Sequence, residues 1–267
     1  MALASIWGCG MFPAERKRKI AQLVAQRGAV TISELSQMFQ VSEMTIHRDL
    51  AQLQALGFLE KTYGGAISRH TFVNPDFTVR LKSNVAEKAG IAARAEELVK
   101  DGDSIILDAS TTCLLLARRL RQKKNLTVFT TGPHALLELA GAPGLTVYAT
   151  GGLLSPETMS LVGAEAERFL ARLHVNKCFV GANSVTVEHG ITDPYPPEAE
   201  VKRCIVEASD EIFLLADHSK FGAIALVTAV DLKAVDLVLT DTGTAPSQLQ
   251  ALEEAGIRYI LCEPLQE

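Results

Sequence analysis

From residue 85 onward the sequence alternates short apolar runs with longer amphipathic stretches, and no other feature constrains the fold as strongly. Seven apolar runs are predicted to be strands, at residues 104–107, 127–130, 146–149, 177–180, 212–216, 237–239 and 258–261. Helical periodicity lies between most of them, at residues 85–100, 112–121, 164–172, 198–208 and 246–255. Strands that alternate with helices form an open, mostly parallel sheet covered by helices. This part of the chain is therefore predicted to be an α/β domain.

The composition is that of an ordinary globular protein. Hydrophobic residues make up 48% of the 267 residues and charged residues 21%, which excludes a disordered, collagen-like or coiled-coil chain. The length suits two domains better than one. No apolar run reaches the roughly 18 residues that a membrane-spanning helix needs, and residues 1–14 lack the basic start and the cleavage-like end of a signal peptide. We therefore expect a cytoplasmic protein with no membrane partner.

The cysteines and histidines indicate no metal site. The five cysteines are scattered and include no Cys-x-x-Cys pair, so we expect reduced thiols rather than disulfides or zinc ligands. His134, His174, His189 and His218 lack the spacing typical of metal ligands. No strand is followed by Gly-x-Gly-x-x-Gly or by a Walker loop, which argues against a nucleotide-binding protein. No metal and no cofactor is therefore predicted.

Residues 15–69 carry a different pattern, of three helices and a hairpin. A first helix over residues 15–26 gathers its apolar side chains on one face. Thr31 and Glu34 form a capping box that begins a second helix. After a short turn, Ser42 caps a third helix that runs to about residue 56.

The third helix is predicted to have a buried and an exposed face. Ile46, Leu50 and Leu53 recur at helical spacing and are expected to face the core. A two-stranded wing is expected from residues 58–63 and 66–68, around a Gly64-Gly65 turn. The predicted DNA contacts on the helix and the wing are Ser42, Met44, Thr45, His47, Arg48, Lys61 and Tyr63.

A helix, a turn and a second helix in this order place the second helix in the major groove of DNA, with its N-terminal residues at the base edges. Residues 15–70 hold eight Lys and Arg and five acidic residues, a balance of +3, whereas the rest of the chain carries −8. Such asymmetry is expected where only the basic unit meets a polyanion. A three-helix adaptor with a solvated charged face is the alternative. Motif, wing and charge together favour double-stranded operator DNA as the partner.

Polar loops follow several predicted strands of the α/β domain. Ser110, Thr111 and Thr112 follow the first strand and open a helix, so their hydroxyl and amide groups can bind a phosphate. Serine and threonine are also ordinary helix caps, which is the structural alternative. Asp108 would repel a phosphate and is interpreted as an acceptor for a sugar hydroxyl or as a brace of the loop. The other predicted effector contacts are Thr130, Gly151, Gly152, Gly181, Asn183, Lys202 and Lys220, and the two lysines are expected to face the phosphate.

Two groups of motifs resemble one family. The run ISELSQMFQVSEMTIHRDLAQLQALGFLEKTYGGAI is similar to the winged helix-turn-helix of the DeoR family of bacterial transcription regulators. From about residue 77 to residue 261, the chain resembles the effector domain of the same family. The motifs of this second resemblance include Glu87-Lys88, Ser110-Thr111-Thr112, Gly151-Gly152, Gly181-Ala182, Val201-Lys202 and Asp217-His218-Ser219-Lys220. The resemblance implies a fold like that of ribose-phosphate isomerases and a phosphorylated sugar as effector.

The chain departs from the family pattern in both regions. His47 stands where the family usually carries a second arginine, and a neutral histidine cannot make the bidentate contact of arginine with guanine. Asn183 stands where aspartate is usual, and Thr131-Gly132 replaces an asparagine followed by a small hydroxyl residue. Asn183 and Thr131-Gly132 both fall in the expected effector site.

These observations predict a transcription regulator, a repressor of a carbohydrate-metabolism operon that is controlled by a phosphorylated sugar. Residues 15–69 form the DNA-binding domain, residues 70–84 a linker, and residues 85–267 the effector-binding and oligomerisation domain. A homo-oligomer, dimer or tetramer, is expected because one helix-turn-helix contacts few base pairs. The alternative is an isomerase-type enzyme with a DNA-binding appendage, whose base would be one of the carboxylates Asp108, Asp193, Glu198 and Asp217. No carboxylate pair has a diagnostic spacing, so we expect no catalytic residue.

Overall fold

The computed structural model describes residues 16–17, 19–20, 23–24, 29–55, 59–62, 64–67, 77–156 and 158–266. The chain forms two compact units, residues 1–73 and 74–267, which we call the head and the body. Within these described ranges, no helix combines the length and the apolar character that crossing a membrane requires.

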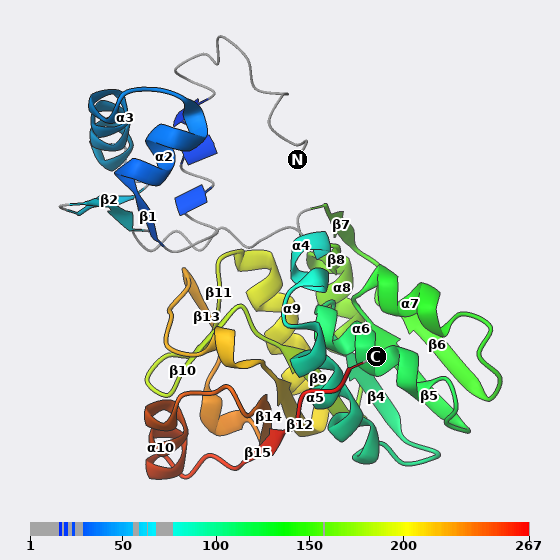
Figure 1. The fold of residues 1–267 in the computed structure, drawn as a ribbon. Helices are drawn as coiled ribbons and strands as arrows, with labels where there is room; N and C mark the ends of the chain where they lie inside the picture. Colours follow the sequence, from blue (N-terminus) through cyan, green and yellow to red (C-terminus); the bar gives the residue numbers. More distant parts are fainter. Residues whose placement is uncertain are drawn as a thin grey trace. The chain divides into compact units, whose positions relative to one another are not determined.

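The described part of the head contains the predicted helices. Residues 16–17, 19–20 and 23–24 are helical, and α2 (Ile32–Phe39) and α3 (Glu43–Ala55) follow (Figure 1). The capping box of α2 is confirmed: the Glu34 amide donates to Oγ1 of Thr31 at 3.2 Å, and the Thr31 amide donates to Oε2 of Glu34 at 2.9 Å. The buried core of the head includes Ile20, Val24, Leu35, Ile46, Leu50, Leu53 and Leu59.

The wing is larger than predicted. Strands β2 (Glu60–Lys61) and β3 (Gly65–Ile67) pair antiparallel, and β3 also pairs with β1 (Ala29–Thr31). The two-stranded prediction was wrong because β1 precedes α2 in the sequence, so its pairing with β3 is not local. A Cβ atom on Gly65 would lie 2.0 Å from the carbonyl oxygen of Val30, so this close pairing requires glycine. Phe58, Tyr63 and Ser68 of the predicted wing lie outside the described residues.

The body is built on one parallel sheet of seven strands. They lie in the order β15-β14-β12-β9-β4-β5-β6, and every adjacent pair is parallel. The strands are β4 (Ser104–Leu107), β5 (Leu126–Thr130), β6 (Leu145–Ala149), β9 (Val175–Gly181), β12 (Ser209–Leu215), β14 (Leu237–Asp241) and β15 (Tyr259–Cys262). All seven coincide with predicted strands to within a few residues. The predicted α/β fold class is therefore confirmed.

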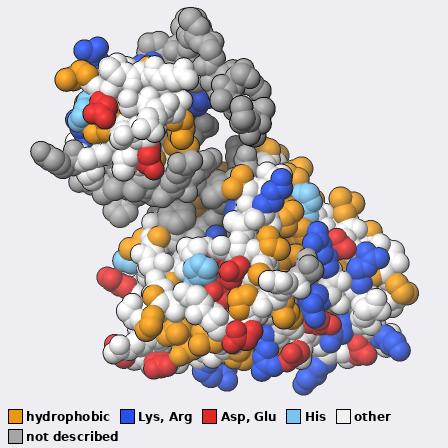
Figure 2. All heavy atoms as spheres, viewed as in Figure 1, with side chains coloured by type: hydrophobic (Ala, Val, Ile, Leu, Met, Phe, Trp, Pro, Cys, Tyr) orange, Lys and Arg blue, Asp and Glu red, His pale blue; other side chains and the backbone are white. Residues whose placement is uncertain are grey.

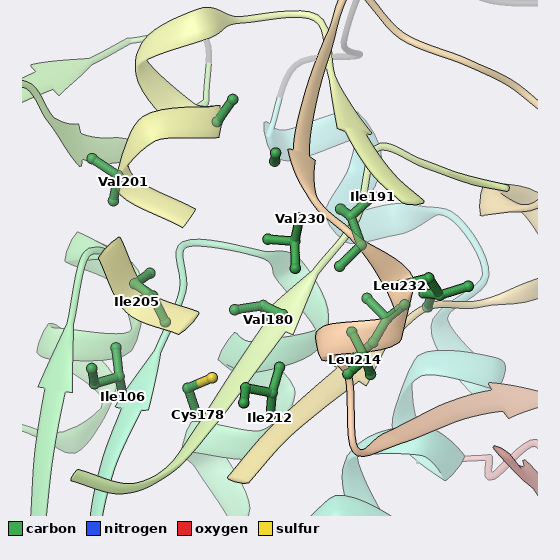
Figure 3. Packing of buried hydrophobic residues seen from close by; sticks show 14 of the residues in the cluster. Ile106, Cys178, Val180, Ile191, Val201, Ile205, Ile212, Leu214, Val230 and Leu232 are labelled. Carbon is green, nitrogen blue, oxygen red and sulfur yellow. The ribbon is translucent and has the colours of Figure 1, made fainter. Parts of the chain in front are cut away.

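Helices cover both faces of this sheet (Figure 1). Buried residues of α5 (Val85–Glu97), α6 (Thr111–Leu120) and α7 (Pro133–Leu139) share a core with one face. Buried residues of α8 (Ala164–Leu170), α9 (Pro196–Glu207) and α10 (Pro246–Glu254) share a core with the other. In this second core, Val201 and Ile205 of α9 lie near strand residues such as Ile106 and Val180 (Figure 3).

Several shorter elements escaped prediction from the sequence. The strands β7 (Leu153–Ser155) and β8 (Ser160–Val162) form a hairpin. The strands β10 (Ser184–Thr186), β11 (Gly190–Asp193) and β13 (Val227–Val230) form a small second sheet. Two 3-10 turns are η1 (His218–Lys220) and η2 (Leu232–Ala234). Helix α4 (Phe77–Lys82) lies within residues 70–84, which were expected to be an irregular linker. It was not predicted because six residues are too few to show a helical period.

Candidate functional site

The exposed face of α3 carries the residues predicted to contact DNA. Met44 is 70% exposed, Ser42 and Arg48 are exposed, and Thr45 and His47 are half-buried. Ile46, Leu50 and Leu53 of the same region are buried in the head core, as predicted. One face of the helix therefore packs against the core, while the other presents hydroxyl, thioether, imidazole and guanidinium groups to solvent.

The N-terminus of α3 is fixed by its cap. The Thr45 amide donates to Oγ of Ser42 at 3.2 Å, and the two hydroxyl oxygens lie 2.9 Å apart. Ser42 therefore caps the helix, as its position predicted. The wing joins the same helix, because the Lys61 amide donates to Oε1 of Gln54 at 3.0 Å. Tyr63, the other wing residue predicted to contact DNA, lies outside the described residues.

A buried ion pair supports α3 from its inner side. Nε of Arg16 lies 2.6 Å from Oδ2 of Asp49, and the two side chains are 9% and 6% exposed. Nζ of Lys17 donates to Oε1 of Gln52 at 2.7 Å beside it. Asp49 was not among the residues predicted to have a structural or DNA-binding role. The available signal was an acidic residue on the otherwise apolar face of the helix.

In the body, a polar cavity lies at the carboxyl ends of β4 and β9, where parallel sheets of this type bind ligands. It is lined by Arg80, Asp108, Ala109, Ser110, Thr158, Gly181, Ala182, Asn183, Asp193, Glu198 and Lys202. A smaller cavity shares residues 108–110 with it. The remaining lining of the smaller cavity is Phe77, Leu114, Gly132, His134, Ala135 and Met159.

Asp108 is the structural centre of the polar cavity. Its Oδ2 accepts hydrogen bonds from the Gly181 amide at 2.7 Å and from Nζ of Lys202 at 2.8 Å, and its Oδ1 accepts from the Ser110 amide at 2.9 Å. Burial would raise the pKa of Asp108, but Lys202 and the bonds from Ser110 outweigh it and lower the pKa to about 2. The carboxylate therefore stays ionised and braces three segments of chain, which is one of the two roles that the sequence suggested.

Lys202 takes part in the same hydrogen-bond network. Besides Asp108, its Nζ donates to the carbonyl oxygen of Gly181 at 3.0 Å. Burial would lower the pKa of Lys202, but the carboxylates of Asp108, Asp193 and Glu198 raise it above its usual value. A Cβ atom on Gly181 would lie 2.5 Å from Cβ of Ser110, so the close packing of the two loops excludes any larger residue. The sequence predicted that Lys202 faces a phosphate; in the structure it lines the cavity, and its ammonium is held by Asp108 and the Gly181 carbonyl.

The cavity lining also contains the carboxylates of Asp193 and Glu198 and the hydroxyl of Thr158. Nδ2 of Asn183 donates to Oδ2 of Asp193 at 2.8 Å, and the Tyr195 amide donates to Oδ1 of Asp193 at 3.0 Å. Burial raises the pKa of Glu198 above its usual value. The hydroxyls of Thr158 and Ser160 are buried beside Glu198, and both act against the rise in the pKa of that carboxyl group.

A cluster of cations adjoins this cavity through Arg80. Nη2 of Arg80 donates to the carbonyl oxygen of Thr158 at 3.1 Å. Burial lowers the pKa of Lys88 to about 8; Asp217 raises it, and Lys220 and Arg80 lower it further. Burial also lowers the pKa of Lys220, against the attraction of Asp217. We call Arg80, Lys88 and Lys220 the cation cluster. Lys220 was a predicted effector contact, whereas Arg80 and Lys88 were not.

The structure brings together five of the predicted effector contacts, namely Asp108, Ser110, Gly181, Asn183 and Lys202, around the polar cavity. Thr111 and Thr112 are each 4% exposed in the first turn of α6, so their side chains belong to the interior. Thr130 is buried, and its Oγ1 accepts from the Gly132 amide at 3.0 Å. Gly151 and Gly152 lie after β6, outside the cavity lining, and Lys220 belongs to the cation cluster.

The described cysteines of the body are free thiols, and one of its histidines contacts a carboxylate. Cys113, Cys178 and Cys262 are buried free thiols, and burial raises the pKa of Cys178 to about 12. Nδ1 of His218 lies 2.8 Å from Oδ2 of Asp241. Among the described residues, no group of three or more His, Cys, Asp and Glu side chains could hold a metal ion.

Comparison with known families supports both units. The family described as a DeoR-like helix-turn-helix domain matches residues 16–72, and the DeoR C terminal sensor domain matches residues 83–242. The chain belongs to the DeoR family. Its helix-turn-helix is therefore a DNA-binding unit, and its body is a sensor domain.

Relatives of this DeoR-type chain match it along most of their length. The HTH-type transcriptional regulator GolR of Listeria innocua is 35% identical over 256 residues, 95% of this chain and 100% of that protein. The transcriptional repressor AccR of Agrobacterium fabrum is 35% identical over 233 residues, 86% of this chain and 90% of that protein. The HTH-type transcriptional repressor GlcR of Bacillus subtilis is 31% identical over 255 residues, 95% of this chain and 99% of that protein.

The DeoR-type chain is thus a transcription regulator, and the isomerase-type enzyme considered as an alternative is set aside, because these relatives are named as regulators and repressors. A more distant likeness connects it with an enzyme of known structure. Ribose 5-phosphate isomerase A of Methanocaldococcus jannaschii is 20% identical and aligns with a TM-score of 0.40 over 52% of this chain and 56% of that one.

Proposed function

We propose that this DeoR-type regulator represses an operon for carbohydrate metabolism and that a phosphorylated sugar, bound in the body, changes its affinity for DNA. The proposal rests on two groups of side chains of different chemistry that adjoin each other at the ends of β4 and β9. A cavity wall rich in carboxylates and hydroxyls adjoins the cation cluster through Arg80. A sugar phosphate has the same two parts, a polyhydroxylated chain or ring and a dianion.

The cavity wall suits the sugar part. The carboxylates of Asp193 and Glu198 can accept hydrogen bonds from sugar hydroxyls, and Thr158 can both donate and accept. The buried Thr158 hydroxyl lies beside the Glu198 carboxyl group. A phosphate dianion would be repelled at this wall.

The cation cluster suits the phosphate part. Arg80, Lys88 and Lys220 adjoin one another, with Asp217 as the carboxylate among them. Charge-assisted hydrogen bonds from guanidinium and ammonium groups to phosphate oxygens are stronger than bonds between neutral groups. A dianion at this cluster would also favour the charged form of Lys88, whose pKa of about 8 lies near neutrality.

Operator DNA is proposed to bind at α3, through Ser42, Met44, Thr45, His47 and Arg48, with Lys61 and Tyr63 of the wing beside it. The charge of the body supports this assignment. On the face of the body shown in Figure 2, basic and acidic side chains are interspersed instead of forming a basic surface. A homodimer or tetramer would place two such helices in half-sites about 34–36 Å apart, or a multiple of that distance.

Thermal unfolding of the full chain tests the proposed effector class. The probes are D-ribose 5-phosphate, D-glucose 6-phosphate, D-fructose 6-phosphate and glycerol 3-phosphate, each paired with its unphosphorylated parent. We expect at least one phosphorylated probe to raise the melting temperature, because a ligand that binds only the folded state stabilises it. The parent compound should stabilise the protein much less.

Lys220→Met and Lys233→Met form a matched pair for the same experiment. Both remove one ammonium group, but Lys220 belongs to the cation cluster and Lys233 is exposed elsewhere on the body. Lys220→Met should weaken the phosphorylated probe by about tenfold or more, and Lys233→Met should leave it unchanged. Equal affinity of the two variants, or stabilisation by the parent sugar alone, would contradict a phosphate site at this cluster.

A further inference from the structure

Strand β6 forms one of the two edges of the main sheet (Figure 1). Its outer side pairs with no other strand of the described chain. An edge strand presents a row of backbone N–H and C=O groups that can pair with a further strand, and proteins usually protect it with charged side chains, proline, a bulge or a covering segment. The two edges of this sheet differ in that respect.

The edge at β15 is protected by charge. Arg258 and Glu263 directly flank this strand in the sequence, and the hydroxyl of Tyr259 donates to Oε1 of Glu253 at 2.6 Å. Charged groups at both ends of a strand oppose its pairing with a further strand, because the new contact would bury them.

The edge at β6 has no such protection. No Asp, Glu, Lys or Arg occurs in residues 139–156, a segment that contains all of β6 and β7. The sequence of β6, Leu-Thr-Val-Tyr-Ala, includes no proline, and its register with β5 is regular along the whole strand. Thr146, Tyr148 and Ala149 are exposed. The strand is therefore uncharged, regular and accessible.

Exposed apolar side chains lie beside this edge. Tyr148 is exposed although its ring stacks on Phe129, with the two centroids 5.1 Å apart. Leu153 and Leu154 of β7 are exposed as well. We call Thr146, Tyr148, Leu153 and Leu154 the edge patch.

Helix α8 brings the two parts of the edge patch together. Phe169 of α8 contacts the Phe129 ring on which Tyr148 stacks, at a centroid distance of 6.1 Å. One turn earlier in α8, Cβ of Ala166 lies 3.1 Å from the position of a Cβ atom on Gly152, which directly precedes β7. Both β6 and the start of β7 are therefore close to α8.

We propose that two copies of this chain pair through the edge patch, with β6 antiparallel to β6 of the second copy. The inference rests on the proposed function, since it names the surface that would form the proposed homo-oligomer. The backbone groups of an edge strand fit a partner that is itself a strand. A two-fold axis makes such a contact self-complementary, because each copy then offers the same surface.

The charge of the body favours this surface for a second copy. The chain outside residues 15–70 carries a net charge of −8, so two copies repel each other wherever acidic surfaces meet. Contact through the uncharged residues 139–156 avoids that repulsion. In addition, one helix-turn-helix contacts few base pairs, which favours a second copy of this chain over an unrelated protein as the partner.

The sequence of β6 suits pairing with itself. An antiparallel pair over the whole of Leu145–Ala149 has Val147 on the axis, opposite the same residue of the second copy. Tyr148 then lies opposite Thr146, and an aromatic side chain opposite a β-branched one is a favourable cross-strand pair. Thr146 and Tyr148 share one face of the strand, so both of these pairs lie on the same side. The two main sheets become one continuous sheet across the axis.

Thr146→Lys and Thr228→Lys in the full-length protein test the inference as a matched pair. Both threonines are exposed and lie on edge strands, Thr146 on β6 and Thr228 on β13 of the small sheet. The substitution on β6 would place two ammonium groups at the proposed contact, where they oppose pairing. Sedimentation equilibrium measures the dissociation constant of the dimer. We expect an unchanged value for Thr228→Lys and a value at least about tenfold higher for Thr146→Lys.

Leu153→Lys and Leu226→Lys form a second pair, which tests the part of the edge patch in β7. The two leucines are 68% and 74% exposed, so neither substitution places a charge in the core. Leu153→Lys should raise the dissociation constant of the dimer at least about threefold, and Leu226→Lys should leave it unchanged. If the wild type forms a tetramer, Thr146→Lys should reduce the tetramer to a dimer.

Hydrogen exchange of the wild type provides a readout that does not depend on the variants. Backbone amides at a free sheet edge exchange rapidly, and pairing with a second strand slows their exchange. The amides of residues 145–149 should therefore exchange at least about threefold more slowly above the measured dissociation constant than below it. Those of residues 259–262, in β15, should exchange at the same rate in both conditions. Equal exchange of residues 145–149 in both conditions would overturn the inference.

The possible failures are distinguishable. A wild type that stays monomeric at the concentrations at which it binds DNA would contradict the homo-oligomer of the proposed function itself. A wild-type dimer with the same dissociation constant as Thr146→Lys would overturn the edge patch alone. Weaker dimerisation of Thr228→Lys but not of Thr146→Lys would likewise overturn it and would place the contact at the small sheet.

Discussion

Nζ of Lys202 lies 2.8 Å from Oδ2 of Asp108, and both side chains are only 6% exposed. The two residues are far apart in the sequence, and their contact joins α9 to the loop between β4 and α6. Because Asp108 also accepts from the Gly181 amide at 2.7 Å, the pair fixes the ends of β4 and β9 relative to each other. The shape of the polar cavity depends on this contact.

Removing the lysine should therefore destabilise the body. Lys202→Met leaves the Asp108 carboxylate buried without its counter-charge, which typically costs about 3–5 kcal/mol. Asp108→Asn combined with Lys202→Met should recover part of that loss, because no buried charge then lacks a partner. Urea unfolding of the two variants measures the difference, with Lys233→Met as the exposed control, expected within about 0.5 kcal/mol of the wild type. A Lys202→Met protein as stable as this control would show that the pair contributes nothing to the stability of the body.

Acid should weaken the same contact. The pKa of Asp108 is lowered from 3.8 to about 2 in the folded protein, so the folded state binds its proton less readily than the unfolded state does. Its contribution is therefore fully present above about pH 4 and is lost as the pH falls towards 2, by about 2 kcal/mol in all. The free energy of unfolding, measured between pH 5 and pH 2, should fall more steeply in the wild type than in Asp108→Asn. An equally steep fall in the two proteins would contradict the lowered pKa of Asp108.

The main sheet could be predicted from the sequence because each of its strands is a compact apolar run bounded by polar residues. The hairpin of β7 and β8 could not, since each strand has only three residues. The pairing of β1 with β3 also escaped prediction, because α2 and α3 separate the two strands in the sequence. A sequence pattern over a few residues reflects their local preference for helix or strand, whereas these elements depend on contacts between distant parts of the folded chain.

The cavity could be predicted only in part, for a related reason. Asp108 and Ser110 follow β4, and Gly181 and Asn183 lie at or just after the end of β9, so their convergence at one edge of the sheet follows from the topology. Arg80 comes from a helix of six residues, which has no periodic signal. Thr111 and Thr112 were expected to face a ligand, but the first turn of α6 directs them into the interior. Which face of that helix is buried is decided by α5 and the sheet.

The buried pair of Arg16 and Asp49 should be essential to the head. Asp49→Ala leaves the guanidinium buried without its carboxylate and should destabilise the head by about 3 kcal/mol or more. DNA binding should then be lost, while stabilisation by the sugar phosphate probe persists, because the two units are separately compact. Glu43→Ala removes an exposed carboxylate of the same helix and should cost no more than about 1 kcal/mol. Full DNA affinity in Asp49→Ala would contradict the supporting role of the pair.

His47 should weaken DNA binding relative to an arginine at the same position. His47→Arg restores a fixed charge and a bidentate donor on the exposed face of α3, so affinity for a selected duplex should rise by about tenfold, with a new preference for guanine. Gln37→Arg adds the same charge on α2 and serves as the control. It should strengthen binding to all duplexes alike and leave base preference unchanged. Identical effects of the two substitutions in a competition with random duplexes would place His47 away from the bases.

The most direct measurement of the central claim is a titration of labelled duplex DNA with the full-length protein, with and without a sugar phosphate that stabilises it. If α3 binds the DNA and the polar cavity with its cation cluster binds the effector, saturating sugar phosphate should change the dissociation constant of the DNA by at least about fivefold. The parent sugar should have no such effect, and Lys220→Met should require about tenfold more effector. A dissociation constant that is unchanged at saturating effector would contradict the account.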